Sequence, residues 1–469
     1  MIDVGKIMTQ EPGALERAAA HGLHPDCPDL RRLGPTLADS AIRALDAGRR
    51  DDDKARTQAW SRGFTRRRFI TGAGTVGVAA IGGQLVTTRV SFAAPGATTA
   101  GTVVVIFLRG GMDGLSVVVP ADDPDLLDRR PGIAVRGSSL LPLDRGFGLH
   151  PALGALLPYW DAGQFAAVPA ISTPDLSRSH FQAQDCLERG SASTSEASTG
   201  WLDRVLEAAG PGTTFRAIAH GATLPRSLTG PQGALALRGI ESFRLKGWDQ
   251  VREASLAALE SLYTGIDHPV GTQALLTLDA VATAQTVAAT EYAPADGASY
   301  PDSGFGQALT DIARLVKSDV GLRVACVDLG GWDMHTGLGT VDDGDMKNLL
   351  TGLGDGLAAF ATDLGDKLGE VTVVTMSEFG RRVGQNANAG TDHGHGGVAL
   401  LLGGQVRGGA VHGAWEGLAG EVLDNGDVPG SNDYRDLLGD VVTRGLGVGE
   451  AALGTVFPGH SYTSLGAMR

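Results

Sequence analysis

Apolar runs of strand length recur along the chain from residue 102 onward, and each ends in a glycine-rich or polar segment. Their residues are mostly Val, Ile, Leu and Ala, without the alternating polar positions of a half-exposed strand. This pattern is typical of strands that are buried on both faces of a sheet. The runs occupy residues 102–108, 164–172, 214–220, 322–331, 371–377 and 397–404.

Longer segments of helical character lie between these runs. Alanine- and leucine-rich sequence predicts mainly helices over residues 240–318, a further helix over 348–368, and a helix from about residue 180. Strands that alternate with helices indicate a mostly parallel sheet with helices on both faces. We therefore expect an α/β fold, an α/β/α sandwich with a mostly parallel central sheet, formed by residues 94–469 as a single domain.

The N-terminal part of the chain departs from this pattern. Residues 65–70 read TRRRFI, a glycine-rich apolar run follows, and small residues surround Ala93. A basic region, an apolar region and a small-residue cleavage site form an export signal, and paired arginines before Phe-Ile indicate the twin-arginine route. We expect a signal peptide over residues 65–93, cleaved after Ala93 or, alternatively, retained as a membrane anchor. Residues 1–64 are expected to be a disordered N-terminal extension.

Composition and charge narrow the classes of partner. The chain has 469 residues, of which 42% are hydrophobic and 20% charged, and its formal net charge is −14. This balance argues against nucleic acid as the main partner, because few cations are left to neutralise phosphates. The export signal predicts that the protein is extracellular, cell-wall associated or periplasmic.

Polar side chains gather where the predicted strands end. Parallel strands share one C-terminal edge, and ligands bind at that edge of open α/β sheets. We therefore expect groups from five separate segments to converge there. In chain order they are Asp113, then Ser177, Ser179 and His180, then Asp333 and His335, then Glu378, and finally Asp392, His393 and His395.

The spacing of these groups favours metal binding. Residues i and i+2 of an extended segment point to the same side, so Asp333 can share an ion with His335, and His393 with His395. Carboxylates and imidazoles together suit Zn²⁺ or Mn²⁺. Four converging carboxylates would also need cations to balance them. We expect one or two divalent ions, with the ligands drawn from Asp113, Asp333, His335, Glu378, Asp392, His393 and His395.

Each motif taken alone also has an ordinary structural explanation. A single H-x-H is more often a surface loop than a ligand pair. The segments SEFGRR and SRSHF both read as helix starts, with Glu378 in a first turn and Ser179 as a cap. The functional interpretation rests on their joint placement after successive buried strands.

Five ordered segments resemble a known family, the domain-of-unknown-function family 1501, over essentially all of residues 101–460. They are VVVIFLRGGMDGLSVVVP, LSRSHFQAQD, TGWLDR, GGWDMHTG and SEFGRRVGQNANAGTDHGHGG. That family is grouped with the alkaline phosphatase and sulfatase superfamily and typically carries twin-arginine signals. The resemblance implies an alkaline phosphatase-like α/β/α sandwich with a two-metal site at the sheet edge.

The resemblance also implies roles for single residues. Asp113 matches the superfamily's metal ligand after the first strand, and Ser179 best matches its nucleophile, with Ser177 as the competitor. The last metal-binding histidine is matched by His393 or His395. Two departures weaken the second metal site: a D-x-H at Asp333–His335 replaces D-x-x-x-H, and Ser377–Glu378 stands where Asp-His is usual. His180 and Asp392 are the residues expected to compensate.

The leading functional interpretation is an exported, metal-dependent hydrolase of phosphate, phosphonate or sulfate esters. Its expected catalytic residues are Ser179, Ser177, His180 and Arg109, and Arg109, Arg178 or Arg381 would bind the anionic oxygens of the substrate. The formylglycine motif of ordinary sulfatases has no match, because in STPDLSR the arginine comes two positions too late.

The alternative is a non-catalytic exported binding or assembly protein that keeps the fold and a structural metal. The altered metal motifs favour it, and the resemblance implies a partner from another exported family, numbered 1800. A serine-to-alanine exchange at Ser179 separates the two interpretations.

Overall fold

The computed structural model describes residues 101–121, 123–193, 196–245, 249–266 and 269–469. All of them belong to one of the two compact units of the chain, Ala73–Arg469. The expected extension over 1–64 and the expected signal peptide over 65–93 lie outside the described residues.

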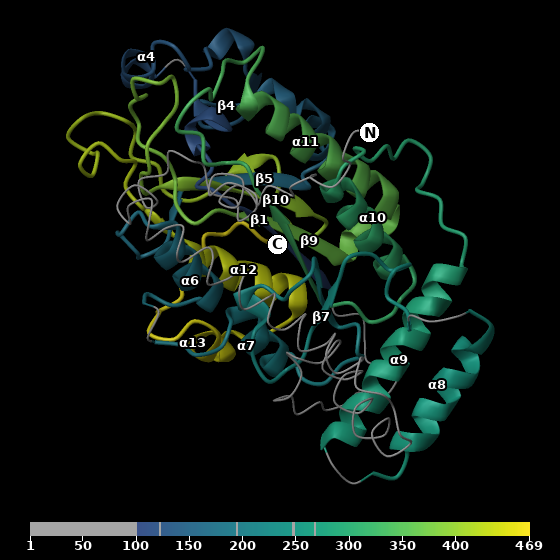
Figure 1. Cartoon of the computed structure of the whole chain (residues 1–469). Helices are drawn as coiled ribbons and strands as arrows, with labels where there is room; N and C mark the ends of the chain where they lie inside the picture. Colours follow the sequence, from purple (N-terminus) through teal and green to yellow (C-terminus); the bar gives the residue numbers. More distant parts are fainter. Residues whose placement is uncertain (1–100, 122, 194–195, 246–248, 267–268) are drawn as a thin grey trace, which may run out of the picture. The chain divides into compact units, whose positions relative to one another are not determined.

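Within the described residues, a nine-stranded sheet forms the centre of the fold (Figure 1). The strand order is β11, β5, β10, β9, β1, β8, β6, β7, and β12 also pairs with β5. Pairings among these strands are parallel except those that β10 makes with β5 and β9. The strands are β1 (Thr102–Leu108), β5 (Phe165–Ser172), β6 (Ala217–His220), β7 (Leu235–Leu237), β8 (Val324–Leu329), β9 (Val371–Met376), β10 (Gly397–Gly403), β11 (Ala410–Val411) and β12 (Asn432–Asp433).

The sequence prediction of a mostly parallel α/β sheet is confirmed, and the observed strands differ from the predicted ones by only a few residues. The antiparallel direction of β10 is the one feature of the large predicted strands that the apolar pattern did not reveal. Gly397, at the start of β10, pairs with Ile171 near the end of β5. The residues before β10 therefore lie at the same edge as the residues that follow the parallel strands.

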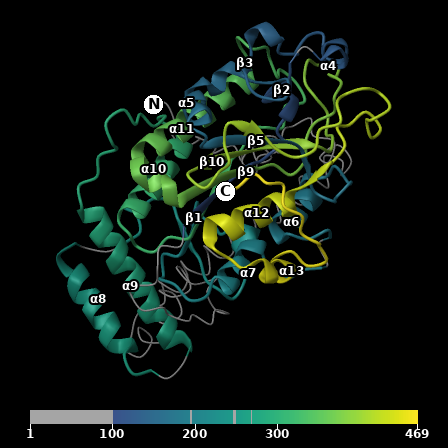
Figure 2. The same ribbon diagram turned by 180° about the vertical axis from the view of Figure 1, so that it is seen from behind.

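Alternate side chains of β1 enter two different hydrophobic cores. Val104 and Ile106 pack into a core shared with α10 (Gly304–Lys317) and α11 (Asp345–Leu364). Val103 and Val105 pack into a second core with α7 (Trp201–Ala208) and α12 (Tyr434–Leu446). The two sets of helices cover opposite faces of the sheet (Figures 1 and 2). This α/β/α sandwich explains the unbroken apolar sequence of β1, because successive side chains of a strand point to opposite faces.

Further elements complete the described part of the chain, and some of them, such as α6 (His180–Arg189) and α9 (Pro269–Ala289), add side chains to the two cores. A second, three-stranded sheet has the order β2–β4–β3. No helix among the described residues is long and apolar enough to span a bilayer. These elements are β2 (Val118–Pro120), β3 (Leu141–Pro142), β4 (Phe147–Leu149), α4 (Pro124–Arg129), α5 (Leu157–Asp161), α6 (His180–Arg189), α8 (Asp249–Tyr263), α9 (Pro269–Ala289) and α13 (Leu453–Val456), with 3-10 turns η1 (Gly114–Ser116), η2 (Gly137–Ser139), η3 (Pro151–Leu156), η4 (Arg226–Leu228), η5 (Gly365–Glu370) and η6 (Glu450–Ala452).

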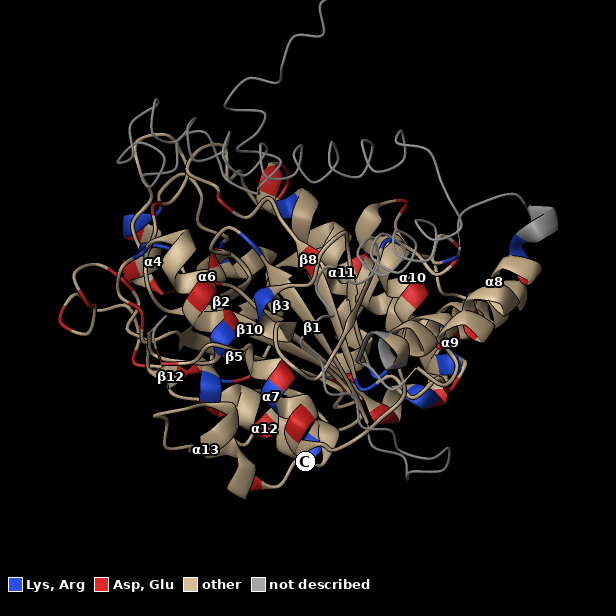
Figure 3. Ribbon diagram, turned by 60° about the horizontal axis from the view of Figure 1, so that its bottom comes forward, with Lys and Arg blue, Asp and Glu red and all other residues tan. Residues whose placement is uncertain are grey.

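Acidic and basic residues are interspersed over the elements of the described chain in the view of Figure 3. The basic residues seen there are spread over several helices and loops rather than gathered along one element.

Candidate metal centre

Three segments bring chemistry-bearing side chains to one edge of the sheet. Asp333 and His335 follow β8, and His180 is the first residue of α6, the helix that follows β5. His393 lies in the segment between β9 and β10. That segment reaches the cluster because β10 is antiparallel and begins at this edge.

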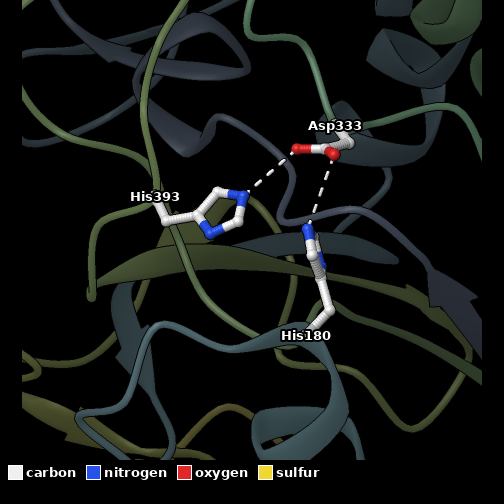
Figure 4. Close-up of side chains that lie close together, drawn as sticks. All are labelled: His180, Asp333 and His393. Atoms are coloured by element: carbon white, nitrogen blue, oxygen red, sulfur yellow. Dashed lines mark hydrogen bonds and ion pairs between the residues drawn. The ribbon is translucent and has the colours of Figure 1, made fainter. Parts of the chain in front are cut away.

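His180, Asp333 and His393 form a compact group of metal-ligating side chains (Figure 4). One ligand atom from each lies within 4.8 Å of the others. The Nε2 atom of His180 is 3.5 Å from Oδ2 of Asp333, and Nε2 of His393 is 3.3 Å from Oδ1. The group therefore offers two imidazole nitrogens and a carboxylate directed at one point.

His335 adds a third imidazole to this group. Its Nε2 atom lies 3.1 Å from Oδ1 of Asp333 and 3.0 Å from Nε2 of His393. Two ring nitrogens that face each other at this distance cannot both carry a proton, so at least one presents a lone pair. All four side chains are only 1–5% exposed, so the donor set is held in a dry environment.

Glu378 fixes the far side of the His180 ring. Its Oε1 atom lies 2.7 Å from Nδ1 of His180 and accepts from Gln184 and from the backbone N–H of Gly110, both at 2.9 Å. Burial alone would raise the pKa of Glu378, but these hydrogen bonds and the His180 contact lower it to about 2. An ionised carboxylate only accepts, so Nδ1 of His180 carries the proton and Nε2 faces Asp333.

The other two histidines are held in the same way. Nδ1 of His335 lies 3.1 Å from Oδ1 of Asp392, and Nδ1 of His393 lies 2.8 Å from the backbone carbonyl of Arg178. Burial opposes ionisation of Asp392, but hydrogen bonds from Asn386 and His335 lower its pKa. Both acceptors therefore receive an Nδ1–H, and both Nε2 atoms turn inward.

This donor set fits a divalent metal ion. Histidine ligands usually donate their second ring nitrogen to a carboxylate or carbonyl, as all three rings do in this cluster. In a tetrahedral zinc site, ligand atoms about 2.0–2.1 Å from the ion lie roughly 3.3 Å from one another. Four separations within the cluster, of 3.0, 3.1, 3.3 and 3.5 Å, are close to that spacing.

Arg381 provides a positive charge beside the cluster. Its guanidinium lies 2.7 Å from Oδ1 of Asp333 and also donates to the backbone carbonyls of Gly110, Gly111, Trp332 and Thr391. Burial would raise the pKa of Asp333, but the three histidines and Arg381 lower it. The charge of Asp333 is thus partly balanced by Arg381, which favours one cation in this cluster over two.

Glycines in the motifs allow the backbone to approach this closely. Gly110 has φ +123°, and a side-chain carbon at this position would lie 2.5 Å from the backbone nitrogen of Asp333. At Gly390 such a carbon would lie 2.2 Å from the carbonyl carbon of His335. Gly110 and Gly390 therefore allow the segments after β1 and before β10 to pack closely against the loop that follows β8.

The structure does not bring Asp113 into this group. Its two carboxylate oxygens lie 2.5 and 2.8 Å from the guanidinium of Arg130, and Ser116 donates to one of them at 2.5 Å. Arg130 also donates to the backbone carbonyls of Arg382 and Val383. Asp113 therefore forms a buried, bidentate ion pair with Arg130, whereas the sequence analysis predicted that it would be a metal ligand.

His395 also lies apart from the three histidines. Its Nε2 atom is 2.9 Å from the backbone carbonyl of Thr173, in the segment after β5. The H-x-H motif thus sends His393 to the cluster and His395 to the segment after β5. The expectation that His393 and His395 share an ion is not met, because their rings contact different segments of the chain.

The expected catalytic residues have different surroundings. Ser179 is the N-cap residue of α6, and its hydroxyl makes no capping hydrogen bond. The hydroxyl of Ser177 donates to Asp175 at 2.6 Å. Arg109 pairs with Glu188 and Asp328, both at 3.0 Å, so its guanidinium is committed to the packing of α6 against β8.

The sequence analysis did not identify two residues that support the buried acids. Gln184 donates a hydrogen bond to Glu378. Its position four residues after His180, on the same face of a helix, is the signal that could have identified it. Arg130 lies in the unremarkable segment DRRPG, where nothing marks it as the partner of Asp113.

Comparison with solved structures gives weak similarities. A PsFucS1 sulfatase from Pseudoalteromonas sp. is 10% identical, with 74% of this chain and 68% of that chain covered and a TM-score of 0.31. Ps i-CgsB, in complex with k-i-k-neocarrahexaose, is 11% identical over 75% and 73%, with a TM-score of 0.31. The lipooligosaccharide phosphoethanolamine transferase A of Neisseria meningitidis is 12% identical over 80% and 62%, with a TM-score of 0.27.

TM-scores of 0.27 to 0.31 are too low to support an argument about fold or function. No curated protein matches the sequence. The family model described as "Protein of unknown function (DUF1501)" matches residues 145–438, which is more than half of the chain. The protein therefore belongs to the DUF1501 family.

Proposed function

We propose that Asp333 and the Nε2 atoms of His180, His335 and His393 bind one divalent metal ion. The observation that carries this proposal is the common orientation of the three rings, each with Nδ1 on an oxygen acceptor and Nε2 toward Asp333. Three imidazoles and one carboxylate favour Zn²⁺, with Mn²⁺ as the alternative.

On this basis the protein is a metal-dependent hydrolase of phosphate, phosphonate or sulfate esters, related to the alkaline phosphatase and sulfatase superfamily. A bound ion would supply Lewis-acid chemistry to such a reaction. Ser179 is the proposed nucleophile, because it directly precedes the ligand His180 and its hydroxyl is not used as a helix cap. The start of α6 also favours negative charge there.

Metal analysis of the full chain by mass spectrometry tests the first step. One ion per chain, with a lower melting temperature in EDTA, is the expected result. A screen against phosphate, phosphonate and sulfate esters then tests turnover. Ser179→Ala should abolish turnover and keep the metal, while Ser242→Ala, in the segment between β7 and α8, should change neither. Absence of metal under all loading conditions refutes the proposal.

A specific observation favours a second function, a non-catalytic exported protein with a structural metal. The four ligand side chains are almost completely buried, and a closed site with four protein ligands is typical of structural zinc. One firmly bound ion per chain without turnover on any ester class would support this alternative. Its partner would come from the exported family numbered 1800, and co-purification with such a protein would test that step.

Export by the twin-arginine route is proposed for both functions. That route carries folded proteins, so the metal would be loaded before export. Changing Arg66 and Arg67 to lysine should retain the protein in the cytoplasm. Export of the double-lysine variant at the normal level would refute the route.

A further inference from the structure

Of the three arginines that the sequence offered for anion binding, two are engaged by several protein acceptors. Arg381 is buried and donates to four backbone carbonyls and to Asp333. Arg109 is held by Gln184, Glu188 and Asp328. Arg178 differs from both, because its side chain is 36% exposed and forms an ion pair with Asp427 at 2.5 Å.

Arg178 is tied to the metal cluster through its backbone. Its carbonyl accepts the Nδ1–H of His393 at 2.8 Å, and it directly precedes Ser179 and His180. The residue has φ +54°, a left-handed conformation that costs energy for any residue with a side chain. The buried carboxylate of Asp427 pairs with one guanidinium nitrogen of Arg178, and the rest of this side chain is partly exposed.

Exposed apolar side chains flank this arginine. Among the described residues, three large apolar side chains are strongly exposed, and two of them, Leu176 at 67% and Phe181 at 56%, lie within three residues of Arg178. A single exposed apolar residue is ordinary on a protein surface. Two of the three such residues therefore lie in the same short segment as the partly exposed Arg178 and as Ser179.

We propose that Arg178, Leu176 and Phe181 form a recognition subsite for an ester whose anionic group is attached to an apolar group. This inference rests on the proposed hydrolase function and specifies its substrate class. Arg178 binds the non-bridging oxygens through its guanidinium. Leu176 and Phe181 contact the apolar part, which is either an aromatic ring or an alkyl chain.

Phosphonates test the subsite without any turnover. Calorimetric titration of the full chain should give a phenylphosphonate affinity about tenfold or more above that of methylphosphonate, since added apolar contact in a binding site is worth that much. Replacing both Leu176 and Phe181 by serine should remove this difference and leave methylphosphonate binding unchanged. Ile266→Ser, at the third exposed apolar residue, is the matched control and should have no effect.

The arginine has its own test. Arg178→Gln should weaken the binding of both phosphonates about tenfold to a hundredfold, which is the range expected for loss of a charge-assisted hydrogen bond. Arg178→Lys keeps the ion pair with Asp427 but loses the planar fork, so it should fold normally and bind with intermediate affinity. Arg226→Gln, an exposed arginine paired with Asp185, is the control.

Octylphosphonate distinguishes the two kinds of apolar group. Tighter binding of the octyl than of the phenyl compound assigns an alkyl substrate, and the reverse assigns an aromatic one. Equal affinity for phenyl-, octyl- and methylphosphonate, or unchanged affinity in Arg178→Gln, would overturn the subsite. Because phenyl-, octyl- and methylphosphonate contain no ester to hydrolyse, their affinities test the subsite even if the protein hydrolyses none of the esters in the activity screen.

Discussion

The Nε2 atoms of His335 and His393 face each other at 3.0 Å, and both lie within 3.3 Å of the same oxygen of Asp333. One arrangement of protons permits this in the free protein, with a hydrogen shared between the rings. A cation between the rings removes the need for that proton. The contact is therefore the most direct indication that this edge of the sheet is built for a metal.

Removing one ring of this pair should remove the metal. His393→Ala takes away a ligand and leaves His335 facing an empty space, so we expect metal content to fall from one ion per chain to a small fraction. The melting temperature should no longer fall when EDTA is added, because no bound metal is left to stabilise the folded state. For the wild type, a metal at a thousandfold excess over its Kd would stabilise the folded state by about 4 kcal/mol. Mass spectrometry of the metal and thermal denaturation measure these effects.

His412→Ala is the matched control for that exchange. His412 lies just after β11, and its ring contacts the backbone carbonyl of Arg407. It should keep full metal content. Equal metal content in His393→Ala and wild type would mean that His393 is not a ligand.

The carboxylate behind His180 should tune metal affinity without binding the ion. Glu378→Gln keeps the size of the side chain but removes the charge that holds the Nδ1–H of His180. Loss of such a supporting carboxylate typically weakens metal binding about 10–100-fold. Competition with a chelator of known affinity measures this. A complete loss of metal would instead indicate that Glu378 coordinates the ion, and an unchanged affinity would exclude any supporting role.

The apolar runs predicted the sheet well because burial on both faces leaves a strong local signal. β1 coincides with the predicted residues 102–108, and β9 and β10 each end one residue before the predicted limit. Strand direction leaves no such signal, since β10 is as apolar as its parallel neighbours. His393 nevertheless lies at the same sheet edge as His180 and Asp333, because the antiparallel strand begins where the others end.

The membership of the metal cluster was harder to predict than its location. His335 and His393 meet through loops whose course depends on contacts such as that of Gly390 with the loop after β8. Asp113 was assigned to a metal because it follows the first strand, but Arg130, 17 residues later, neutralises it. Side-chain pairing of this kind is decided by packing, and no spacing rule in the sequence reports it.

Asp113 should therefore matter for stability and not for metal binding. Asp113→Asn leaves the buried guanidinium of Arg130 without its counter-charge, and breaking a buried pair in this way costs about 3–5 kcal/mol. Urea denaturation should show that loss in the free energy of unfolding, with metal content unchanged. Replacing Arg130 by methionine in the same chain should recover part of the stability, since no unpaired charge is then buried. Loss of metal in Asp113→Asn at full stability would restore Asp113 as a ligand.

A second buried carboxylate should make the fold sensitive to acid, away from the metal cluster. Asp363, at the end of α11, accepts from Lys317, Tyr292, Tyr300 and the backbone N–H of Ala295. Burial alone would raise its pKa, but these donors lower it. A lowered pKa in the folded state means that the stabilisation is complete above the ordinary pKa of aspartate, near 4, and is lost as the pH falls through the lower folded value.

Asp363→Asn should accordingly destabilise the protein by about 1–3 kcal/mol at pH 7, because buried donors lose a charged acceptor. The difference between variant and wild type should stay constant from pH 7 to about pH 5 and shrink below about pH 4, where Asp363 of the unfolded chain takes up a proton before the folded one does. Urea denaturation of the variant and of the wild type across this pH range measures the two free energies of unfolding. The exposed Asp319, paired with Lys367 on the surface, provides the control, and Asp319→Asn should change stability little at any pH. A difference for Asp363→Asn that grew toward low pH would reverse the sign of the argument, since it would require the folded pKa to lie above the ordinary value.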